Sequence, residues 1–165
     1  MAAHYSSALA PFLAENPQAL LGVLTEGLAK EGFDTTILTA FSWLDEIGEL
    51  QNAFRNLLDS LPSSGAWHVM LEYVIPIVGQ RIDCVLIAED LIYVVEYKAG
   101  DTTTARSALK QAQEYALNLM DFHEESRGRN VIPIALGNFK THIPLDTHGM
   151  PQHGFSALPG TFPEA

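Results

Sequence analysis

The sequence offers almost nothing that could cross-link the chain or anchor it in a membrane. Cys84 is the only cysteine, which excludes an internal disulfide framework and a cysteine-rich zinc site. No segment approaches the roughly 20 apolar residues of a membrane-spanning helix. The first residues also lack the basic segment and apolar run of a secretory signal. We therefore expect a cytoplasmic protein with no membrane contact.

Basic residues are scarce as well. The chain has 9 lysines and arginines against 20 aspartates and glutamates, which gives a formal net charge of −11. Proteins that coat nucleic acid regardless of its sequence carry a basic surface, so the composition argues against that class. The G-x-x-x-x-G-K-[ST] loop of a helicase motor is also missing. Any nucleic-acid role must rest on a local site or on a partner.

Apolar residues, in contrast, are abundant enough to build a core. They make up 47% of the chain, against 18% charged residues, which is ordinary for a globular domain. Residues 1–140 alternate between apolar patterns and short turns, and they predict a single domain. Residues 141–165 contain 4 prolines and 3 glycines without apolar periodicity, so we expect a tail or a truncated linker there.

The apolar pattern of the first half predicts helices. Residues 7–33 indicate one or two short helices interrupted by proline. Residues 35–62 repeat apolar side chains at intervals of three and four, which is typical of an amphipathic helix that stops at Pro62. The apolar positions of this helix are Phe41, Leu44, Ile47, Leu50, Phe54, Leu57 and Leu61.

Three strands joined by hairpin turns are predicted next. They cover residues 66–78, 81–88 and 91–98, with turns at Gly79–Gln80 and Glu89–Asp90. A second amphipathic helix over residues 102–126 and a buried strand over 131–136 follow. The apolar stripe of this helix is Ala108, Ala112, Tyr115, Leu119 and Phe122. The order predicts an α/β fold with a mixed sheet flanked by helices.

The last hairpin carries charged residues inside an apolar run. If Glu89 and Asp90 form a two-residue turn, Asp83 lies directly opposite Glu96, and Lys98 shares their face. Two carboxylates about 5 Å apart repel by about 3 kcal/mol at an effective dielectric of 20. Lys98 offsets part of this repulsion, and a divalent cation with oxygen ligands offsets more. An ordinary ion-pair network is the alternative, and a one-residue bulge would turn Asp83 away.

At these residues the sequence resembles the PD-(D/E)XK nuclease superfamily, whose pattern is an acid on one strand and acid-x-Lys on the next. Here the pattern is Asp83 followed by Glu96-x-Lys98, and Ile82 stands where the named motif has proline. The resemblance covers about residues 35–136. It implies a restriction-endonuclease-like core of helix, three strands, helix and strand, preceded here by extra N-terminal helices.

The resemblance also implies a reaction, the hydrolysis of phosphodiester bonds. Asp83 and Glu96 would bind Mg²⁺ or Mn²⁺, with the backbone carbonyl of Tyr97 as a further ligand. Lys98 would position or activate the attacking water. Glu72 is a lesser candidate for the metal, since it shares the face of Asp83 but is expected farther down the sheet.

Other family features can be placed on the two amphipathic helices. Gln111 and Tyr115 match the Gln-x-x-x-Tyr element of RecB-like members, and they would orient Lys98, the metal-bound water or a phosphate. Packing in the core is the alternative for Tyr115. Family members often add a glutamate from the first helix, which Glu46 or Glu49 could supply. A solvated helix face is the interpretation we favour for both glutamates.

Three further stretches resemble the N-terminal nuclease-like region of bacterial helicase proteins related to the schlafen group. They are "HYSSALAPFL", "LEYVIPIVGQRID" and "VIPIALGNF". The resemblances together lead us to expect a nuclease that acts on DNA rather than RNA, with a helicase domain or partner, and they leave a homodimer open. Two alternatives remain: an inactive nuclease fold that binds nucleic acid or protein, and an unrelated α/β protein whose acidic hairpin is purely structural.

Overall fold

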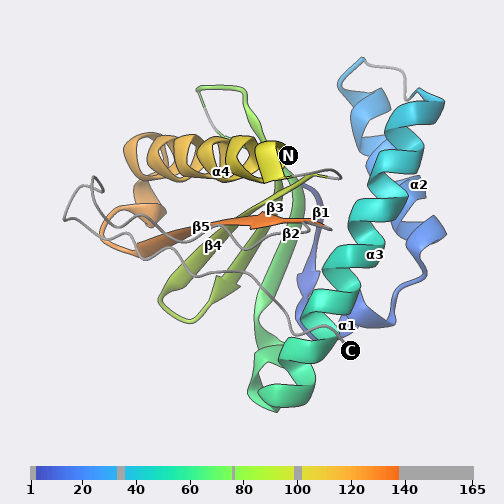
Figure 1. Ribbon diagram of the computed structural model, residues 1–165, viewed down its shortest axis with the longest axis horizontal. Coiled ribbons are helices and arrows are strands. Elements are labelled where there is room, and N and C mark those ends of the chain that lie inside the picture. The colour runs from blue at the N-terminus through green and yellow to red at the C-terminus, as the bar shows by residue number, and fades with distance from the viewer. Residues whose placement is uncertain (1–2, 33–35, 76, 99–101, 138–165) are drawn as a thin grey trace.

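The computed structural model describes residues 3–32, 36–75, 77–98 and 102–137, and it contains a five-stranded mixed sheet with helices on both faces (Figure 1). The strands are β1 (Ala3–Ala8), β2 (His68–Val74), β3 (Arg81–Ala88), β4 (Leu91–Tyr97) and β5 (Asn130–Leu136). The helices are α1 (Leu9–Ala14), α2 (Pro17–Lys30), α3 (Ile37–Ser60) and α4 (Thr102–Phe122), with short 3₁₀ helices η1 (Pro62–Ala66) and η2 (Glu124–Ser126). The predicted α/β fold with a mixed, helix-flanked sheet is confirmed. The predicted tail, residues 141–165, lies outside the described residues.

The strands follow one another in the sheet in chain order, from β1 to β5. Neighbouring strands are antiparallel except for β4 and β5, which run parallel and are connected through α4. The edge strand β1 was not predicted, because residues 7–33 were interpreted as helical from their start. In the described part of the chain, no helix combines the length and apolar character needed to cross a bilayer.

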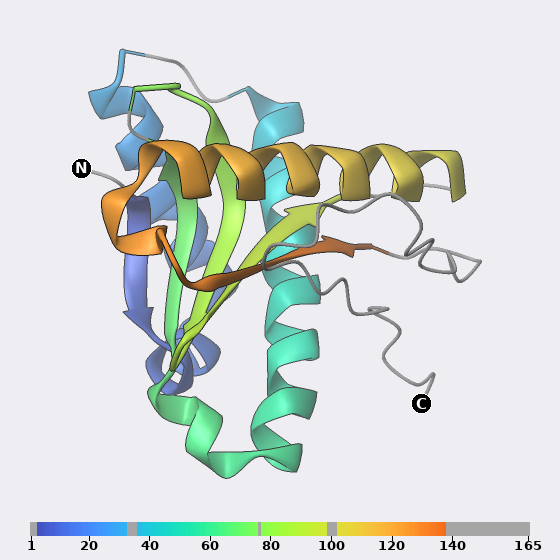
Figure 2. The ribbon, with the colours of Figure 1, turned by 90° about the vertical axis from the view of Figure 1, so that its left-hand side faces the viewer.

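Helices α1 to α3 cover one face of the sheet, and α4 covers the other (Figures 1 and 2). Three fully buried alanines of α4, Ala108, Ala112 and Ala116, form the part of its surface that faces the sheet, and small side chains allow a close approach. Phe122, predicted to lie on the same stripe, is 43% exposed at the end of the helix. The core between the sheet and helices α1 to α3 is more aromatic than the core under α4, and it contains Phe12, Trp43 and Phe54.

Helix α3 begins at a conventional cap, since the side chain of Thr36 accepts a hydrogen bond from the backbone N–H of Thr39. Its buried side differs from the prediction in the first turns. Phe41 is 63% exposed, whereas Trp43 and Glu46 are buried. Phe41 was predicted from spacing alone, which did not include Trp43 among the apolar positions. The buried side therefore brings an acidic residue against the sheet.

The hairpin register is as predicted at the second turn. Ala88 pairs with Leu91 and Cys84 with Val95, so Glu89 and Asp90 form a two-residue turn. The first turn is longer than expected: six residues, 75–80, lie between β2 and β3, and the N–H of Ile75 donates to the carbonyl of Gln80 at 2.8 Å.

Candidate metal site

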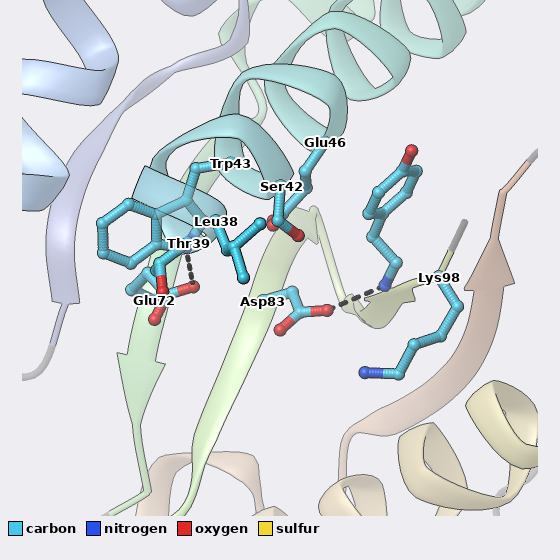
Figure 3. A pocket seen from close by; sticks show the side chains of 9 residues that line it. Leu38, Thr39, Ser42, Trp43, Glu46, Glu72, Asp83 and Lys98 are labelled. Carbon is cyan, nitrogen blue, oxygen red and sulfur yellow. Dashed lines mark hydrogen bonds between the residues drawn. The ribbon is translucent and has the colours of Figure 1, made fainter. Parts of the chain in front are cut away.

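A pocket of about 360 Å³ opens between the first turns of α3 and one end of strands β2, β3 and β4 (Figure 3). Its walls combine aromatic, hydroxyl and carboxylate side chains with one lysine. The lining residues are Leu38, Thr39, Ser42, Trp43, Glu46, Glu72, Asp83, Tyr97 and Lys98.

Three carboxylates from three different elements converge in this pocket. Glu46 comes from α3, Glu72 from β2 and Asp83 from β3, and one oxygen from each lies within 4.8 Å of the others. Glu72 lies opposite Asp83 in the register of β2 and β3. The flanking pairs show this, since Leu71 pairs with Cys84 and Tyr73 pairs with Ile82. The prediction that Glu72 lies farther down the sheet is therefore wrong.

Burial makes these three acids hard to ionise. Glu46 is 6% exposed and has no hydrogen bond or ion pair to another described residue. Burial raises its pKa well above the usual range, and the charges of Asp83 and Glu72 raise it further. Burial also raises the pKa of Asp83, although the N–H of Tyr97 donates to its Oδ2 at 2.8 Å and counteracts part of the shift.

Glu72 is the carboxylate with the most partners. Its Oε1 accepts a hydrogen bond from the indole N–H of Trp43 at 3.0 Å, and Arg81 Nε lies 3.4 Å from its Oε2. Burial raises the pKa of Glu72, and the nearby Arg81 guanidinium opposes that shift. Glu46, which no described residue pairs with, points into the same pocket (Figure 3).

Glu96 and Lys98 form an ion pair next to Asp83. Lys98 Nζ lies 2.9 Å from Glu96 Oε1, but neither buried oxygen of Glu96 has a hydrogen bond of good geometry to the residues that the structure describes. Burial and the charge of Asp83 raise the pKa of Glu96 to about 7. Desolvation lowers the pKa of Lys98, but the bond to Glu96 outweighs it and the net pKa is raised. Lys98 is therefore an ammonium ion near neutral pH, and Figure 3 shows it extending toward Asp83.

Gln111 and Tyr115 lie on α4 and do not line the pocket. Gln111 Nε2 donates to Tyr115 Oη at 2.7 Å, so the predicted one-turn pair is formed. Burial raises the pKa of Tyr115, and the charges of Glu96 and Asp83 also raise it. Its hydroxyl is thus close enough for the charges of these carboxylates to act on it, while the ring packs against the core on the α4 side of the sheet.

The structure brings together most of the residues that the sequence pointed to. Asp83, Glu96 and Lys98 are neighbours, and Tyr97 lines the pocket, although the ligand role of its carbonyl oxygen stays a prediction. Glu49 is exposed as expected.

Glu46 is the residue for which the favoured interpretation was wrong, since it is buried rather than solvated. The signal that could have identified it is the spacing of Trp43, Ile47, Leu50 and Phe54. This spacing defines a buried side of α3 that includes position 46. The prediction had centred the apolar stripe on Phe41 and therefore rotated the first turns of the helix.

The geometry suits a divalent cation with oxygen ligands. Mg²⁺ binds oxygen at about 2.0–2.1 Å and Ca²⁺ at about 2.3–2.6 Å, so oxygens on opposite sides of one ion lie about 4–5 Å apart. The three oxygens of Glu46, Glu72 and Asp83 all lie within 4.8 Å of one another, close enough to contact a single ion of this kind. Glu46 supplies the further indication, because a buried carboxylate that no described residue pairs with is costly unless something neutralises it.

Comparisons with protein-family models, with curated proteins and with solved structures return no match to this chain. The functional argument therefore rests on the residues and their geometry.

Proposed function

We propose that the protein is a Mg²⁺- or Mn²⁺-dependent nuclease that hydrolyses phosphodiester bonds, with DNA as its substrate. The observation that carries the proposal is the convergence of Glu46, Glu72 and Asp83 in an open pocket, with Lys98 at its wall. The order of α3, three antiparallel strands, α4 and a parallel strand supports membership of the PD-(D/E)XK superfamily, on the residues that already resemble it.

Asp83 has the central role in this proposal. It lies between the α3 and β2 carboxylates on one side and Glu96 on the other, and its charge raises the pKa of both Glu46 and Glu96. Asp83, Glu46 and Glu72 would hold the cation, with Glu96 as an additional or alternative ligand. A bound Mg²⁺ or Mn²⁺ would lower the pKa of a coordinated water and stabilise negative charge on the phosphate.

Lys98 serves as a positive charge rather than as a base. Because its pKa is raised, it keeps its protons near neutral pH and cannot accept one from water. It can donate to a phosphate oxygen or to the attacking water, and its ion pair with Glu96 fixes its direction. The Gln111–Tyr115 pair lies on α4, near enough for the charges of Glu96 and Asp83 to raise the pKa of Tyr115, and its hydroxyl would help to orient Lys98 or a phosphate.

The net charge of −11 shapes the proposal further. A phosphate backbone is repelled by such a chain unless cations or a basic partner intervene. We therefore include a DNA-engaging partner, such as a fused or separate helicase domain, in the proposal. The same charge favours one second candidate, an inactive nuclease fold that serves as a binding module for a protein partner rather than nucleic acid.

A cleavage assay separates the two candidates. The protein is incubated with linear, circular, single-stranded and branched DNA in Mn²⁺, beside Lys98→Ala and the control Lys110→Ala, an exposed lysine of α4 paired with Glu114. The nuclease proposal expects cleavage by the wild type and by Lys110→Ala and none by Lys98→Ala. Cleavage at full rate by Lys98→Ala would refute the mechanism. Mn²⁺ binding without cleavage of any substrate would favour the binding module.

A further inference from the structure

The backbone of β2 is unusual at one of the pocket carboxylates. Glu72 has φ of +51°, in the left-handed region, although it lies inside a strand and carries a full side chain. Its neighbours Leu71 and Tyr73 pair normally with Cys84 and Ile82. Non-glycine residues in this region are strained, and such strain persists only where surrounding contacts impose it. Something must therefore hold Glu72 in this conformation.

Two side chains from other elements contact the carboxylate of Glu72. Trp43, 5% exposed on α3, donates its indole N–H to Oε1, and Arg81, on β3, places Nε 3.4 Å from Oε2. Glu72 is itself 5% exposed. One oxygen of the carboxylate thus accepts a hydrogen bond, and the other lies beside a guanidinium charge. Glu46, in the same pocket, has no such donor among the described residues.

Satisfying a buried carboxylate does not by itself explain this arrangement. A glutamate could meet Trp43 and Arg81 with a relaxed backbone if its orientation were unimportant, and the strained φ indicates that one orientation is being selected. That orientation points into the pocket toward Glu46 and Asp83 (Figure 3).

We infer that Trp43 and Arg81 are positioning residues that hold Glu72 as a preoriented ligand and thereby make the pocket selective for small divalent cations over large ones. The inference rests on the proposed function, because it assumes that the pocket binds a cation. Mg²⁺ needs ligands near ideal octahedral positions and Mn²⁺, of similar size, takes octahedral oxygen sites as well, whereas the larger Ca²⁺ accepts irregular and flexible coordination. Loosening Glu72 should therefore weaken the small ions more than Ca²⁺.

Calorimetric titration of Mn²⁺ and of Ca²⁺ tests the inference. The variants are Trp43→Phe, which removes the N–H donor, and Trp67→Phe, which changes the other tryptophan, a residue outside the pocket. We expect Trp43→Phe to weaken Mn²⁺ binding about tenfold, within the range for ligand-orienting partners, and Ca²⁺ binding less than about threefold. Trp67→Phe should change neither. Equal weakening of both ions, or no weakening, would overturn the inference.

Arg81→Lys provides a second route if Trp43→Phe is unfolded by circular dichroism. Lysine keeps the positive charge but lacks the planar Nε donor, so the ratio of Mn²⁺ to Ca²⁺ affinity should again fall. An unchanged ratio would overturn the inference. The two proposals fail differently: a wild type that binds neither ion contradicts both, while a wild type that cleaves DNA and variants with an unchanged ratio contradict only the positioning role.

Discussion

Strands β2, β3 and β4 differ from one end to the other. Near the Glu89–Asp90 turn the pairing is regular, with Leu86 opposite Tyr93 and also paired with Val69 of β2. At the other end, the pairing of β3 with β4 stops at Cys84 and Val95. Beyond that point the backbone carries acidic side chains, a strained glutamate and a backbone N–H bonded to a carboxylate instead of a carbonyl.

The contrast indicates that the two ends of the sheet have different roles. The regular end buries apolar side chains on both faces and provides stability. The irregular end gathers Glu46, Glu72, Asp83 and Glu96 at low solvent exposure, where each carboxylate has a raised pKa. Such a group of acids lowers stability in the absence of a cation, which is typical of functional sites. The two ends should therefore respond oppositely to substitution.

The largest expected effect is on activity at the irregular end. Asp83→Asn removes the carboxylate that neighbours Glu46 and Glu72 as well as Glu96. Cleavage should therefore fall by more than about 100-fold, beyond the loss typical of an orienting partner. Thermal unfolding should show a fold as stable as the wild type or more stable, because one buried negative charge is gone. Retained cleavage, or a large loss of stability, would contradict the central role of Asp83.

The regular end should show a large effect on stability alone. Leu86 is 3% exposed in the core under α1 to α3, and Leu86→Ala should lower the free energy of unfolding by about 3 kcal/mol through lost burial and a cavity. Urea denaturation measures the change. Mn²⁺ affinity of the folded variant should equal that of the wild type, and a parallel loss of metal binding would show that the two ends are not independent.

The pH dependence of stability measures the protonation of the buried carboxylates at the irregular end. The pKa of Glu96 is raised from 4.5 to about 7, so between these values the folded state holds a proton that the unfolded state releases. The free energy of unfolding of the metal-free protein should therefore fall as pH rises from 5 to 8. We expect a decrease of a few degrees in Tm, measured in a chelator, and a smaller one in Glu96→Gln. A Tm that rises with pH would contradict the assignment.

The smallest effect concerns the strained backbone. Glu72→Gly and Glu72→Ala both remove the carboxylate, but only glycine adopts φ of +51° without strain. The glycine variant should be more stable than the alanine variant by about 1 kcal/mol, because the pairs on either side, Leu71 with Cys84 and Tyr73 with Ile82, keep this backbone angle after the carboxylate is removed. The same two substitutions at Met70, which pairs regularly with Val85 in β2, should show the reverse order. If the alanine variant were the more stable one at both positions, the result would argue against strain at Glu72.

The local part of the site could be predicted from the sequence. The apolar runs around Glu89 and Asp90 imply a two-residue turn, and that turn sets the register that brings Asp83 close to Glu96 and Lys98. The one-turn spacing of Gln111 and Tyr115 likewise implied their contact. These relations depend on neighbours in the chain, whose geometry follows from regular hairpin and helix periodicity.

The remaining carboxylates could not be placed in this way. Glu72 reaches the site through a longer turn and a left-handed backbone angle, and neither is encoded by alternating apolar residues. Glu46 enters because α3 packs its Trp43 side on the sheet and leaves Phe41 exposed. A spacing of three and four residues allows several rotations of a helix about its axis, and packing selects among them.

By itself the sequence determined an α/β fold, the second hairpin turn and the grouping of Asp83, Glu96 and Lys98, because these depend on short-range periodicity. Only the tertiary structure decided that a glutamate of α3 and one of β2 complete the pocket. Residues far apart in the chain meet there through the rotation of one helix and the strained backbone of one strand. Both are set by the balance of packing and hydrogen bonding across the whole domain.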